Sequence, residues 1–299
     1  MNTPLRFDDQ VFIVTGAGRG LGAAYARLLA SRGARVVVND VGASLAGGGS
    51  DRCVADSLVA EIAKTGGIAV ASTDSVEDGA RIVELALKQF GRVDGVINNA
   101  GNLRDAAFHK VIDEDWDAVF RVHVLGAYRV TRAAWPVMRE RNYGRVVMIG
   151  SASGIYGNFG QAGYSAAKMA VYGLARTLAV EGRGKNILVN VLAPAASSRM
   201  TDSTAPPEIS ALLPPECVSP VAAYLCHSSC VDSGELWEAL AGRVRKYRWE
   251  RSVGVHAARN ELTPEFVASN YAAISDFSGA THPRDTQEAY AADLKPGGA

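Results

Sequence analysis

Hydrophobic residues in the first two thirds of the chain alternate between short continuous runs and longer segments with helical spacing. The short runs are rich in β-branched residues and are bounded by turn or charged residues, which is typical of strands covered on both faces. They predict six strands, at Val11–Thr15, Arg35–Asn39, Ile68–Thr73, Gly95–Asn98, Arg145–Ile149 and Leu188–Leu192. Helices are predicted between them, at Gly20–Arg32, Cys53–Thr65, Asp78–Phe90, Glu114–Asn142 and Ala162–Arg183. This alternation predicts an α/β fold with a doubly wound parallel sheet and helices on both faces.

The hydrophobic pattern weakens after Pro194, where residues 195–215 hold four prolines and little periodicity. That segment predicts a long loop. Beyond it, the sequence predicts a helix over Glu216–His227, a seventh strand over Gly234–Leu240 and another helix over Pro264–Ile274. We therefore expect a seven-stranded sheet, one domain over residues 1–242 and a C-terminal extension of the same domain over residues 243–299.

Composition excludes several classes of protein. The 31 Lys and Arg residues balance the 31 Asp and Glu residues, so no overall basic field favours nucleic acid or an anionic membrane surface. No apolar stretch reaches the about 18 residues that a membrane span needs. The four cysteines are too few and too unevenly placed for a disulfide framework. Cys226, His227 and Cys230 have no fourth ligand spaced nearby, so we expect no metal site.

The two ends of the sequence bear on location. The first residues lack the charged-then-apolar form of a secretory signal. The last four, Pro296-Gly297-Gly298-Ala299, do not form a peroxisomal signal of the Ser-Lys-Leu type. We therefore expect a cytoplasmic location.

A glycine-rich string connects the first predicted strand to the first predicted helix. Glycines at such a turn let the backbone approach a pyrophosphate, and the helix N-terminus faces the phosphates. In this context the string predicts a Rossmann-type dinucleotide site, with cofactor-binding residues Gly16, Gly18, Arg19, Gly20, Leu21 and Gly22.

Asp40 closes the second predicted strand. A carboxylate there can accept hydrogen bonds from an adenosine ribose and would repel a 2′-phosphate, which favours NAD over NADP as the cofactor. Arg19 weighs slightly the other way, because a cation in that loop could contact a phosphate. The alternative for Asp40 is an ordinary acidic turn residue.

Two further segments follow strands at the edge where open α/β sheets bind ligands. Asp74, Ser75 and Val76 come after the third strand, and Asp74 could bond the adenine edge. Asn99, Ala100 and Gly101 come after the fourth, and the small Ala100 and Gly101 let a cofactor pass close to the backbone. Each segment could instead be a simple turn.

The catalytic candidates are a serine and two residues of the following helix. Ser151 ends the fifth strand, and Tyr164 and Lys168 lie four residues apart, on one face of the helix. A phenol has a pKa of about 10, so acid/base work near neutrality needs a neighbouring cation, which Lys168 provides. Lys168 could also bond the nicotinamide ribose, and Ser151 could hold the substrate oxygen near Tyr164.

With these residues the chain resembles the short-chain dehydrogenase/reductase family over roughly residues 8–242. The resemblance comes from the glycine string, Asn98-Asn99-Ala100-Gly101, Ser151, Tyr164-Ser-Ala-Ala-Lys168 and Ala193-Pro194. It implies that Pro194 also contacts the cofactor. Asp113–Asp117, Ser151–Gln161 and Arg248–Arg251 resemble, more closely, the dehydrogenase parts of multifunctional β-oxidation enzymes.

That closer resemblance implies NAD-dependent oxidation of a (3R)-hydroxyacyl-CoA, including bulky or steroid-linked ones, to the 3-ketoacyl-CoA. The implied partners are a small-molecule acyl-CoA thioester and a second copy of the chain, in a homodimer or homotetramer through helices near 114–142 and 162–183. The alternatives are a 17β-hydroxysteroid dehydrogenase and a 3-oxoacyl-thioester reductase. A cofactor-binding scaffold or sensor without turnover is disfavoured, because Ser151, Tyr164 and Lys168 are all present.

The sequence departs from the family where most members carry a catalytic asparagine. His123 stands there, and it is either a proton-relay residue or a packed structural histidine. The cations in Arg243–Arg251 could receive CoA phosphates or could form a solvated or edge-strand surface of the dimer.

Overall fold

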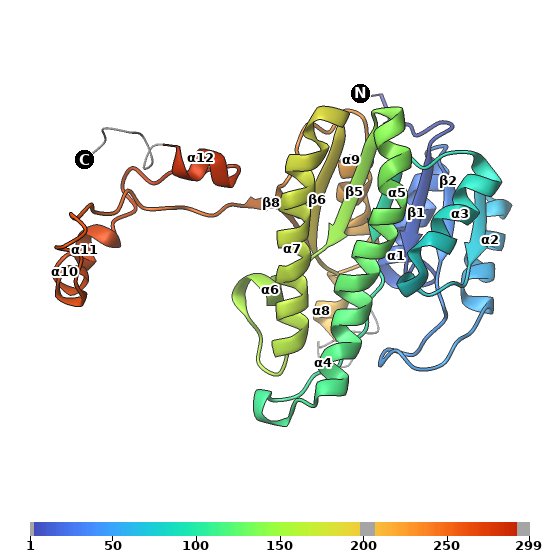
Figure 1. Ribbon diagram of the computed structural model, residues 1–299. Coiled ribbons are helices and arrows are strands. Elements are labelled where there is room, and N and C mark those ends of the chain that lie inside the picture. The colour runs from blue at the N-terminus through green and yellow to red at the C-terminus, as the bar shows by residue number, and fades with distance from the viewer. Residues whose placement is uncertain (1–2, 198–206, 292–299) are drawn as a thin grey trace. The chain divides into compact units, whose positions relative to one another are not determined.

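The computed structural model describes residues 3–197 and 207–291. Its strands form one sheet in the order β3-β2-β1-β4-β5-β6-β7-β8 (Figure 1). The strands are β1 Val11–Thr15, β2 Arg35–Asn39, β3 Ile68–Ser72, β4 Gly95–Asn98, β5 Gly144–Ile149, β6 Ile187–Ala195, β7 Leu236–Leu240 and β8 Arg243–Tyr247. The α/β fold with a doubly wound sheet is confirmed, and all seven expected strands are present.

The strands from β1 to β7 run parallel. β1 pairs with β2 on one side and with β4 on the other, so the strand order reverses between β1 and β4. Ligands of such sheets bind outside the carboxyl ends of the strands at this reversal.

Helices cover both faces of the sheet (Figure 1). One layer contains α1 Gly20–Ser31, α2 Cys53–Lys64 and α9 Ser219–Cys226, and the other contains α3 Gly79–Phe90, α5 Ala127–Arg141 and α7 Ala162–Gly182. Between the first layer and the sheet lies a hydrophobic core that includes Phe12, Tyr25 and Leu29, none more than 1% exposed. Burial on both faces explains why the strands are continuous apolar runs.

The sheet has one strand more than expected. β8 was missed because its sequence, Arg-Val-Arg-Lys-Tyr, is charged, with Arg243 to Lys246 all exposed. Charged residues are typical of an edge strand, where they discourage pairing with other chains. Only Ala241 and Gly242 connect β7 to β8, and a two-residue connection makes the pair antiparallel.

The chain forms two compact units, residues 1–246 and 247–299. The domain boundary expected at residue 242 stays a prediction, and β8, which begins directly after it, belongs to the same sheet as β7. The second unit contains the short helices α10 Pro264–Ser269, α11 Tyr271–Ile274 and α12 Thr286–Tyr290, and a bridge between Arg251 and Thr281. None of its described residues, 247–291, is buried.

The expected long helix over Glu114–Asn142 has three parts. α4 Asp113–Phe120 continues into a π-helical turn, η3 Arg121–Gly126, and then into α5. A short helix, α6 Ala152–Tyr156, was not predicted. Short 3-10 turns lie at η1 Val76–Asp78, η2 Phe108–Lys110, η4 Arg183–Lys185 and η5 Pro215–Cys217, and α8 covers Pro207–Ala211. Residues 198–206 of the expected long loop lie outside the described part of the chain.

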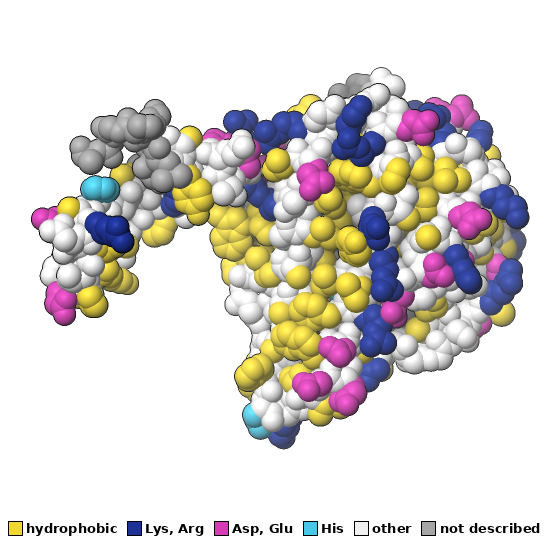
Figure 2. Space-filling model, viewed as in Figure 1, with side chains coloured by type: hydrophobic (Ala, Val, Ile, Leu, Met, Phe, Trp, Pro, Cys, Tyr) yellow, Lys and Arg dark blue, Asp and Glu magenta, His cyan; other side chains and the backbone are white. Residues whose placement is uncertain are grey.

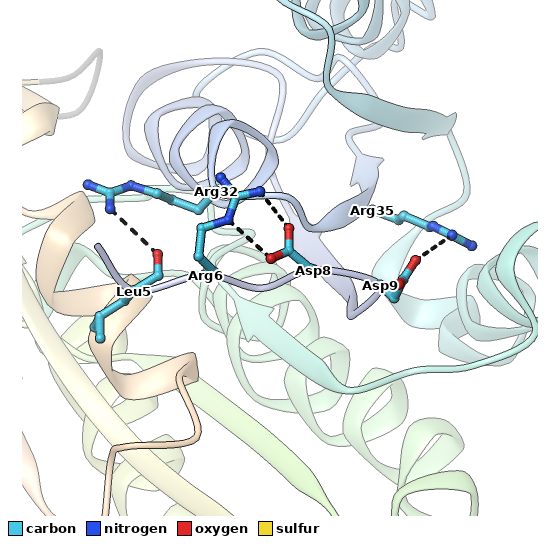
Figure 3. A network of polar contacts seen from close by, with 6 residues as sticks. All are labelled: Leu5, Arg6, Asp8, Asp9, Arg32 and Arg35. Carbon is cyan, nitrogen blue, oxygen red and sulfur yellow. Dashed lines mark hydrogen bonds and ion pairs between the residues drawn. The ribbon is translucent and has the colours of Figure 1, made fainter. Parts of the chain in front are cut away.

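The segment before β1 lies at the amino ends of the strands and carries two exposed ion pairs. Figure 3 shows Arg6 with Asp8, Arg35 with Asp9, and Arg32 donating to the Leu5 carbonyl. These exposed contacts add little stability, whereas Phe7 between them is buried and packs edge-on against Phe12. The network lies at the edge opposite the carboxyl ends of the strands.

Candidate functional site

The glycine string forms a turn with no room for side chains. Gly16 has a φ of +59°, and a Cβ on it would lie 2.8 Å from the Ala100 Cα. A Cβ on Gly22 would lie 2.2 Å from the Gly16 carbonyl oxygen, and one on Gly18 would lie 2.3 Å from the Val54 Cγ1. The turn therefore requires glycine at these positions, as a backbone that closely approaches a pyrophosphate does.

The other residues of the string begin the helix. Gly20, with a φ of +53°, and Leu21 start α1, and Leu21 packs partly buried against the core. Arg19 precedes the helix in extended conformation and is exposed. The Arg19 side chain is therefore not packed against the turn, whereas Gly18 and Gly22 are in close contact with their neighbours.

Asp40 lies beside this turn. One carboxylate oxygen accepts a hydrogen bond from the Gly18 N–H at 2.8 Å, and the other accepts one from the Gly42 N–H at 2.7 Å. The carboxylate thus braces the turn as an acidic turn residue would. Each carboxylate oxygen can accept more than one hydrogen bond, so this brace is compatible with the ribose contact.

Asn99 and Ala100 lock the turn onto the end of β4. The Asn99 side chain donates to the carbonyls of Thr15 and Gly16 at 3.0 Å, and the Ala100 N–H donates to the Thr15 hydroxyl. Gly101 follows, and a Cβ on it would lie 2.4 Å from the His123 ring. The two glycine-containing strings predicted from sequence are therefore in direct contact.

Asp74, Ser75 and Val76 form the turn after β3. The Ser72 hydroxyl donates to the Asp74 carboxylate, and the Ser75 hydroxyl accepts from the Glu77 N–H and caps η1. Val76 is buried, in contact with Gly126. Ser75 is used as a cap and Val76 is buried, so Asp74 is the residue of these three whose side chain suits a contact with the adenine edge. Pro194, at the end of β6, is half-buried and pairs with Ala239 of β7.

The catalytic candidates converge beyond the end of β5. Ser151 precedes α6, and its hydroxyl accepts from the Ser153 N–H at 3.1 Å. Tyr164 and Lys168 lie on the first turns of α7, with the Lys168 Nζ 5.4 Å from the centre of the Tyr164 ring. Lys168 is buried and donates to the Ile149 carbonyl at 2.6 Å, which fixes its ammonium beside β5.

Burial dominates the electrostatics of this group. It raises the pKa of Tyr164, and the neighbouring Ser151 hydroxyl offsets part of that rise. Burial also lowers the pKa of Lys168 to about 7. In the chain without cofactor, burial sets the direction of the Tyr164 pKa shift, and the expected lowering by Lys168 stays a prediction.

His123 is packed against the catalytic tyrosine. The two rings lie edge to face with centres 5.3 Å apart. The His123 Nε2 contacts the Asn102 carbonyl oxygen at 2.9 Å and the Asn102 nitrogen at 3.2 Å, while Nδ1 is buried with no partner among the described residues. Burial, reinforced by Lys168, lowers the pKa of His123 to about 3, so the ring is neutral. Of the two sequence interpretations, this geometry favours the packed histidine.

The sequence reasoning missed two residues at this edge. Asp105, after β4, accepts a hydrogen bond from the Gln161 side chain at 2.8 Å, directly before α7. The only signal for Asp105 was its position just after a strand end, and Gln161 appeared only as the last residue of a motif.

Other candidate chemistry lies elsewhere. Cys226 and Cys230 are buried free thiols, and no group of three metal-ligating side chains occurs in the part of the chain that the structure describes. In the basic segment, Arg245 pairs with Glu238 and Lys246 pairs with Asp232. These pairs favour a surface role over CoA phosphate binding. No described helix is both long and apolar enough to cross a membrane.

The residues present fit a nicotinamide dinucleotide. A cradle that a Cβ would fill lies at the strand-order reversal beside Asp40, and Ser151, Tyr164 and Lys168 lie together at the carboxyl end of the sheet. A hydroxyl, a phenol and an ammonium at one end of such a cradle can position an alcohol, exchange its proton and hold a ribose.

Comparisons with known proteins agree with this geometry. The short chain dehydrogenase family model matches residues 10–208. Mouse peroxisomal multifunctional enzyme type 2 is 53% identical over 96% of this chain and 40% of its own length. The full-length Drosophila melanogaster enzyme of that name has a similar structure, with a TM-score of 0.82 and 41% identity over 97% of this chain and 49% of its own.

A third similar structure is a 7α-hydroxysteroid dehydrogenase complexed with NADH and 7-oxo glycochenodeoxycholic acid. Its TM-score is 0.73, with 27% identity over 81% of this chain and 98% of that one. The resemblance to multifunctional enzymes is thus confirmed. The chain spans only 40%, 64% and 32% of three of those curated relatives.

These relatives overturn the expected cytoplasmic location. Five of them, from animals, a slime mould and fungi, are named peroxisomal enzymes and point to the peroxisome. The expectation was wrong because it relied on the last residues of a chain that spans only part of its relatives. The fold, the motif spacing and the family match establish that this chain is an oxidoreductase of the short-chain dehydrogenase/reductase family.

Proposed function

We propose that the chain oxidises a (3R)-hydroxyacyl-CoA to the 3-ketoacyl-CoA, with NAD as its cofactor. The observation that carries the proposal is the convergence of Ser151, Tyr164 and Lys168 at the end of a glycine cradle that Asp40 closes. The names of the multifunctional relatives support the acyl substrate.

In this proposal Tyr164 acts as the general base, with its phenolate oxygen receiving the proton of the substrate alcohol. Ser151 holds the same substrate oxygen, whose charge changes as the carbonyl forms. NAD, when bound, supplies the hydride acceptor and a positive charge. Lys168 contributes its ammonium beside Tyr164, and its pKa of about 7 places the change of that charge near neutral pH.

His123 is assigned to positioning in the same scheme. Its neutral ring packs edge-on against Tyr164 and is itself held by Asn102. Gly101 is required beside it, because a Cβ there would strike the ring.

The choice of NAD over NADP rests on Asp40. Its carboxylate is fixed beside the glycine turn by hydrogen bonds from the Gly18 and Gly42 N–H groups. A 2′-phosphate at that position would bring two negative charges together. The NADH complex of the 7α-hydroxysteroid dehydrogenase supports the same choice.

An apolar acyl group would find exposed aromatic side chains on two segments, one before α4 and one before α7. Three aromatic side chains there are largely exposed: Tyr156 at 71%, Phe159 at 90% and Phe108 at 78%. The Ala106 N–H donates to the Gly160 carbonyl at 2.9 Å, which ties the segments that carry Phe108 and Phe159. Burying such side chains against an apolar chain is favourable.

The same proposal includes a homodimer or homotetramer. Figure 2 shows hydrophobic side chains gathered on the face over α5 and α7. Leu125 and Tyr128, at the start of that face, and Val180 on α7 are 40–42% exposed. A second copy would remove this surface from water.

The test is NADH formation from paired (3R)- and (3S)-hydroxyacyl-CoA esters, a free 17β-hydroxysteroid and an acyl-carrier-protein thioester, each with NAD and with NADP. We expect turnover of the (3R)-CoA ester with NAD, and a loss of about a thousandfold in Tyr164→Phe with NAD binding retained. Turnover of the steroid alone, or equal activity in Tyr164→Phe, would contradict the proposal.

A further inference from the structure

Two loops that flank Tyr164 are tied together. One follows β4 and carries Asp105 and Ala106, and the other precedes α7 and carries Gly160 and Gln161. The Gln161 Nε2 donates to the Asp105 carboxylate at 2.8 Å, and the Ala106 N–H donates to the Gly160 carbonyl at 2.9 Å. The loops are therefore fixed by one side-chain and one backbone hydrogen bond.

Gln161 is the residue from which the catalytic helix starts. It is the N-cap of α7, yet its side chain makes no capping hydrogen bond to that helix. Instead its amide nitrogen is held by Asp105 and its amide oxygen accepts from the Asn158 side chain at 3.0 Å. Its backbone carbonyl accepts from the Ser165 N–H at 2.7 Å, within the turn that contains Tyr164. The first turn of α7 is thus anchored sideways to the loop after β4.

We propose that Asp105 is a positioning residue of the dehydrogenase reaction, which fixes the first turn of α7, and with it the Tyr164 hydroxyl, through Gln161. The inference rests on the proposed function only where it concerns rate. Its structural part, the anchoring of α7, holds for any activity of the same site.

Asp105 also acts on Tyr164 through its charge. Ser151 faces Tyr164 from the end of β5, His123 from η3, Lys168 from α7 itself and Asp105 from the loop after β4. α4 adds Trp116, against Gly163, while its Asp115 is paired with Arg104. Burial is the main reason why the Tyr164 pKa is raised, and the Asp105 carboxylate adds to the rise. Removing that charge therefore favours the phenolate, the base form that oxidation needs.

Three substitutions separate the anchor from the charge. Asp105→Asn keeps an oxygen that can accept from Gln161 and removes the charge. Asp105→Ala removes both, and Gln161→Ala removes the anchor but keeps the charge. Glu114→Gln, an exposed acid on α4, is the matched control for charge removal.

The first measurement is amide hydrogen exchange of residues 162–166 in the protein without substrate. We expect faster exchange in Asp105→Ala and Gln161→Ala, and exchange at the wild-type rate in Asp105→Asn and Glu114→Gln. Wild-type exchange in both alanine variants would overturn the proposal. If Asp105→Ala exchanges faster throughout the chain, because it is unfolded, Gln161→Ala decides the result.

The second measurement is the pH profile of NAD-dependent oxidation. We expect kcat to fall about tenfold in both alanine variants, with KM for NAD unchanged, and to be retained in Asp105→Asn. We expect the acidic limb of Asp105→Asn to move to lower pH, and that of Glu114→Gln to stay in place. An unmoved limb in Asp105→Asn would overturn the charge effect. If wild type fails to turn over hydroxyacyl-CoA, the proposed function fails, while the exchange experiment still tests the anchor.

Discussion

The cofactor half and the catalytic half of the site are built in different ways. In the cofactor half, Gly16, Gly18 and Gly22 leave no space for a side chain, and Asp40 and Asn99 hold their backbone by hydrogen bonds. In the catalytic half, buried side chains fill the space, among them Lys168 and His123. Ligand binding in the cofactor half therefore depends on the shape of the backbone, whereas the catalytic half depends on the charges of buried side chains.

The two halves also differ in whether their polar side-chain atoms have hydrogen-bond partners. In the cofactor half, both Asp40 carboxylate oxygens and the Asn99 amide nitrogen bond backbone groups. By contrast, His123 Nδ1, Asn102 Oδ1 and Ser165 Oγ are buried without a partner among the described residues. Buried groups of this kind are costly and shift pKa values, so small changes of charge should alter the catalytic half most.

The largest expected effect is in the cofactor half. In Gly22→Ala the new Cβ would meet the Gly16 carbonyl oxygen and the Asn99 side chain. Overpacking against backbone costs about 2–3 kcal/mol, and displacement of the turn should weaken NAD binding by about a hundredfold or more. Calorimetric titration with NAD and denaturant unfolding check both effects.

Gly173→Ala is the control for that substitution. Gly173 lies inside α7, and a Cβ on it would meet nothing within 4 Å. Alanine there should raise the free energy of unfolding by roughly 0.5–1 kcal/mol, with NAD binding unchanged. Equal NAD affinity in Gly22→Ala and wild type would refute the requirement for glycine in the turn.

The next effect belongs to His123 in the catalytic half. Its pKa is lowered to about 3 in the folded chain, whereas an unfolded chain has an ordinary value of about 6.5. Between these values the unfolded state binds the extra proton, so stability falls as pH falls below 6.5. From pH 7 to pH 5 the loss from this one group is about 2 kcal/mol.

Denaturant unfolding at the two pH values measures this loss. His123→Asn should lack this part of the pH dependence, while His109→Gln, which removes an exposed histidine, should keep it. An identical slope in wild type and His123→Asn would mean that His123 is not buried as a neutral ring.

The sequence was most informative where one physical requirement dominates. Strands buried on both faces must be continuous apolar runs, and all six before Pro194 lie within a few residues of their predicted bounds. A turn that has no space for side chains must be built from glycines, so the glycines at residues 16–22 predicted the close approach of the backbone seen there. Ser151, Tyr164 and Lys168 meet because helical spacing and a strand end bring them together.

Features that depend on tertiary contacts were not visible in the same way. The apolar spacing of residues 114–142 is that of a continuous helix, and nothing in it marks the π-helical turn at Arg121–Gly126. β8 has no apolar run because it lies at an edge. The Asp105–Gln161 contact joins residues 56 positions apart on two loops, where no periodic pattern applies. The burial of Tyr164 and Lys168, which shifts the pKa of both groups, is likewise not visible in their helical spacing.

A smaller effect tests the charge of the cofactor half. Asp40→Asn keeps an oxygen that can accept from the Gly18 N–H and removes the negative charge. We expect the preference of kcat/KM for NAD over NADP to fall about tenfold, because repulsion of the 2′-phosphate is lost. Asp74→Asn, another acid at a strand end, is the matched control and should keep the preference. A preference unchanged in Asp40→Asn would leave Asp40 as a turn residue only.

The smallest expected effect concerns the exposed aromatic residues on the segments before α4 and α7. Phe159 is 90% exposed, so its substitution should not destabilise the fold, and Phe159→Ser tests only its contact with substrate. Covering part of a phenyl ring with an acyl chain should be worth about 1 kcal/mol, which is roughly a fivefold rise in KM when the ring is removed. The rise should appear for a long-chain (3R)-hydroxyacyl-CoA and not for a four-carbon one, as measured by initial rates of NADH formation. Val231→Ser, at an 83% exposed position, controls for loss of an exposed apolar side chain. If Phe159→Ser raises KM equally for both substrates, the aromatic side chain contacts the thioester or supports the loop and does not contact the acyl chain. Loop shape would then govern substrate binding in the catalytic half, as backbone shape governs the cofactor half.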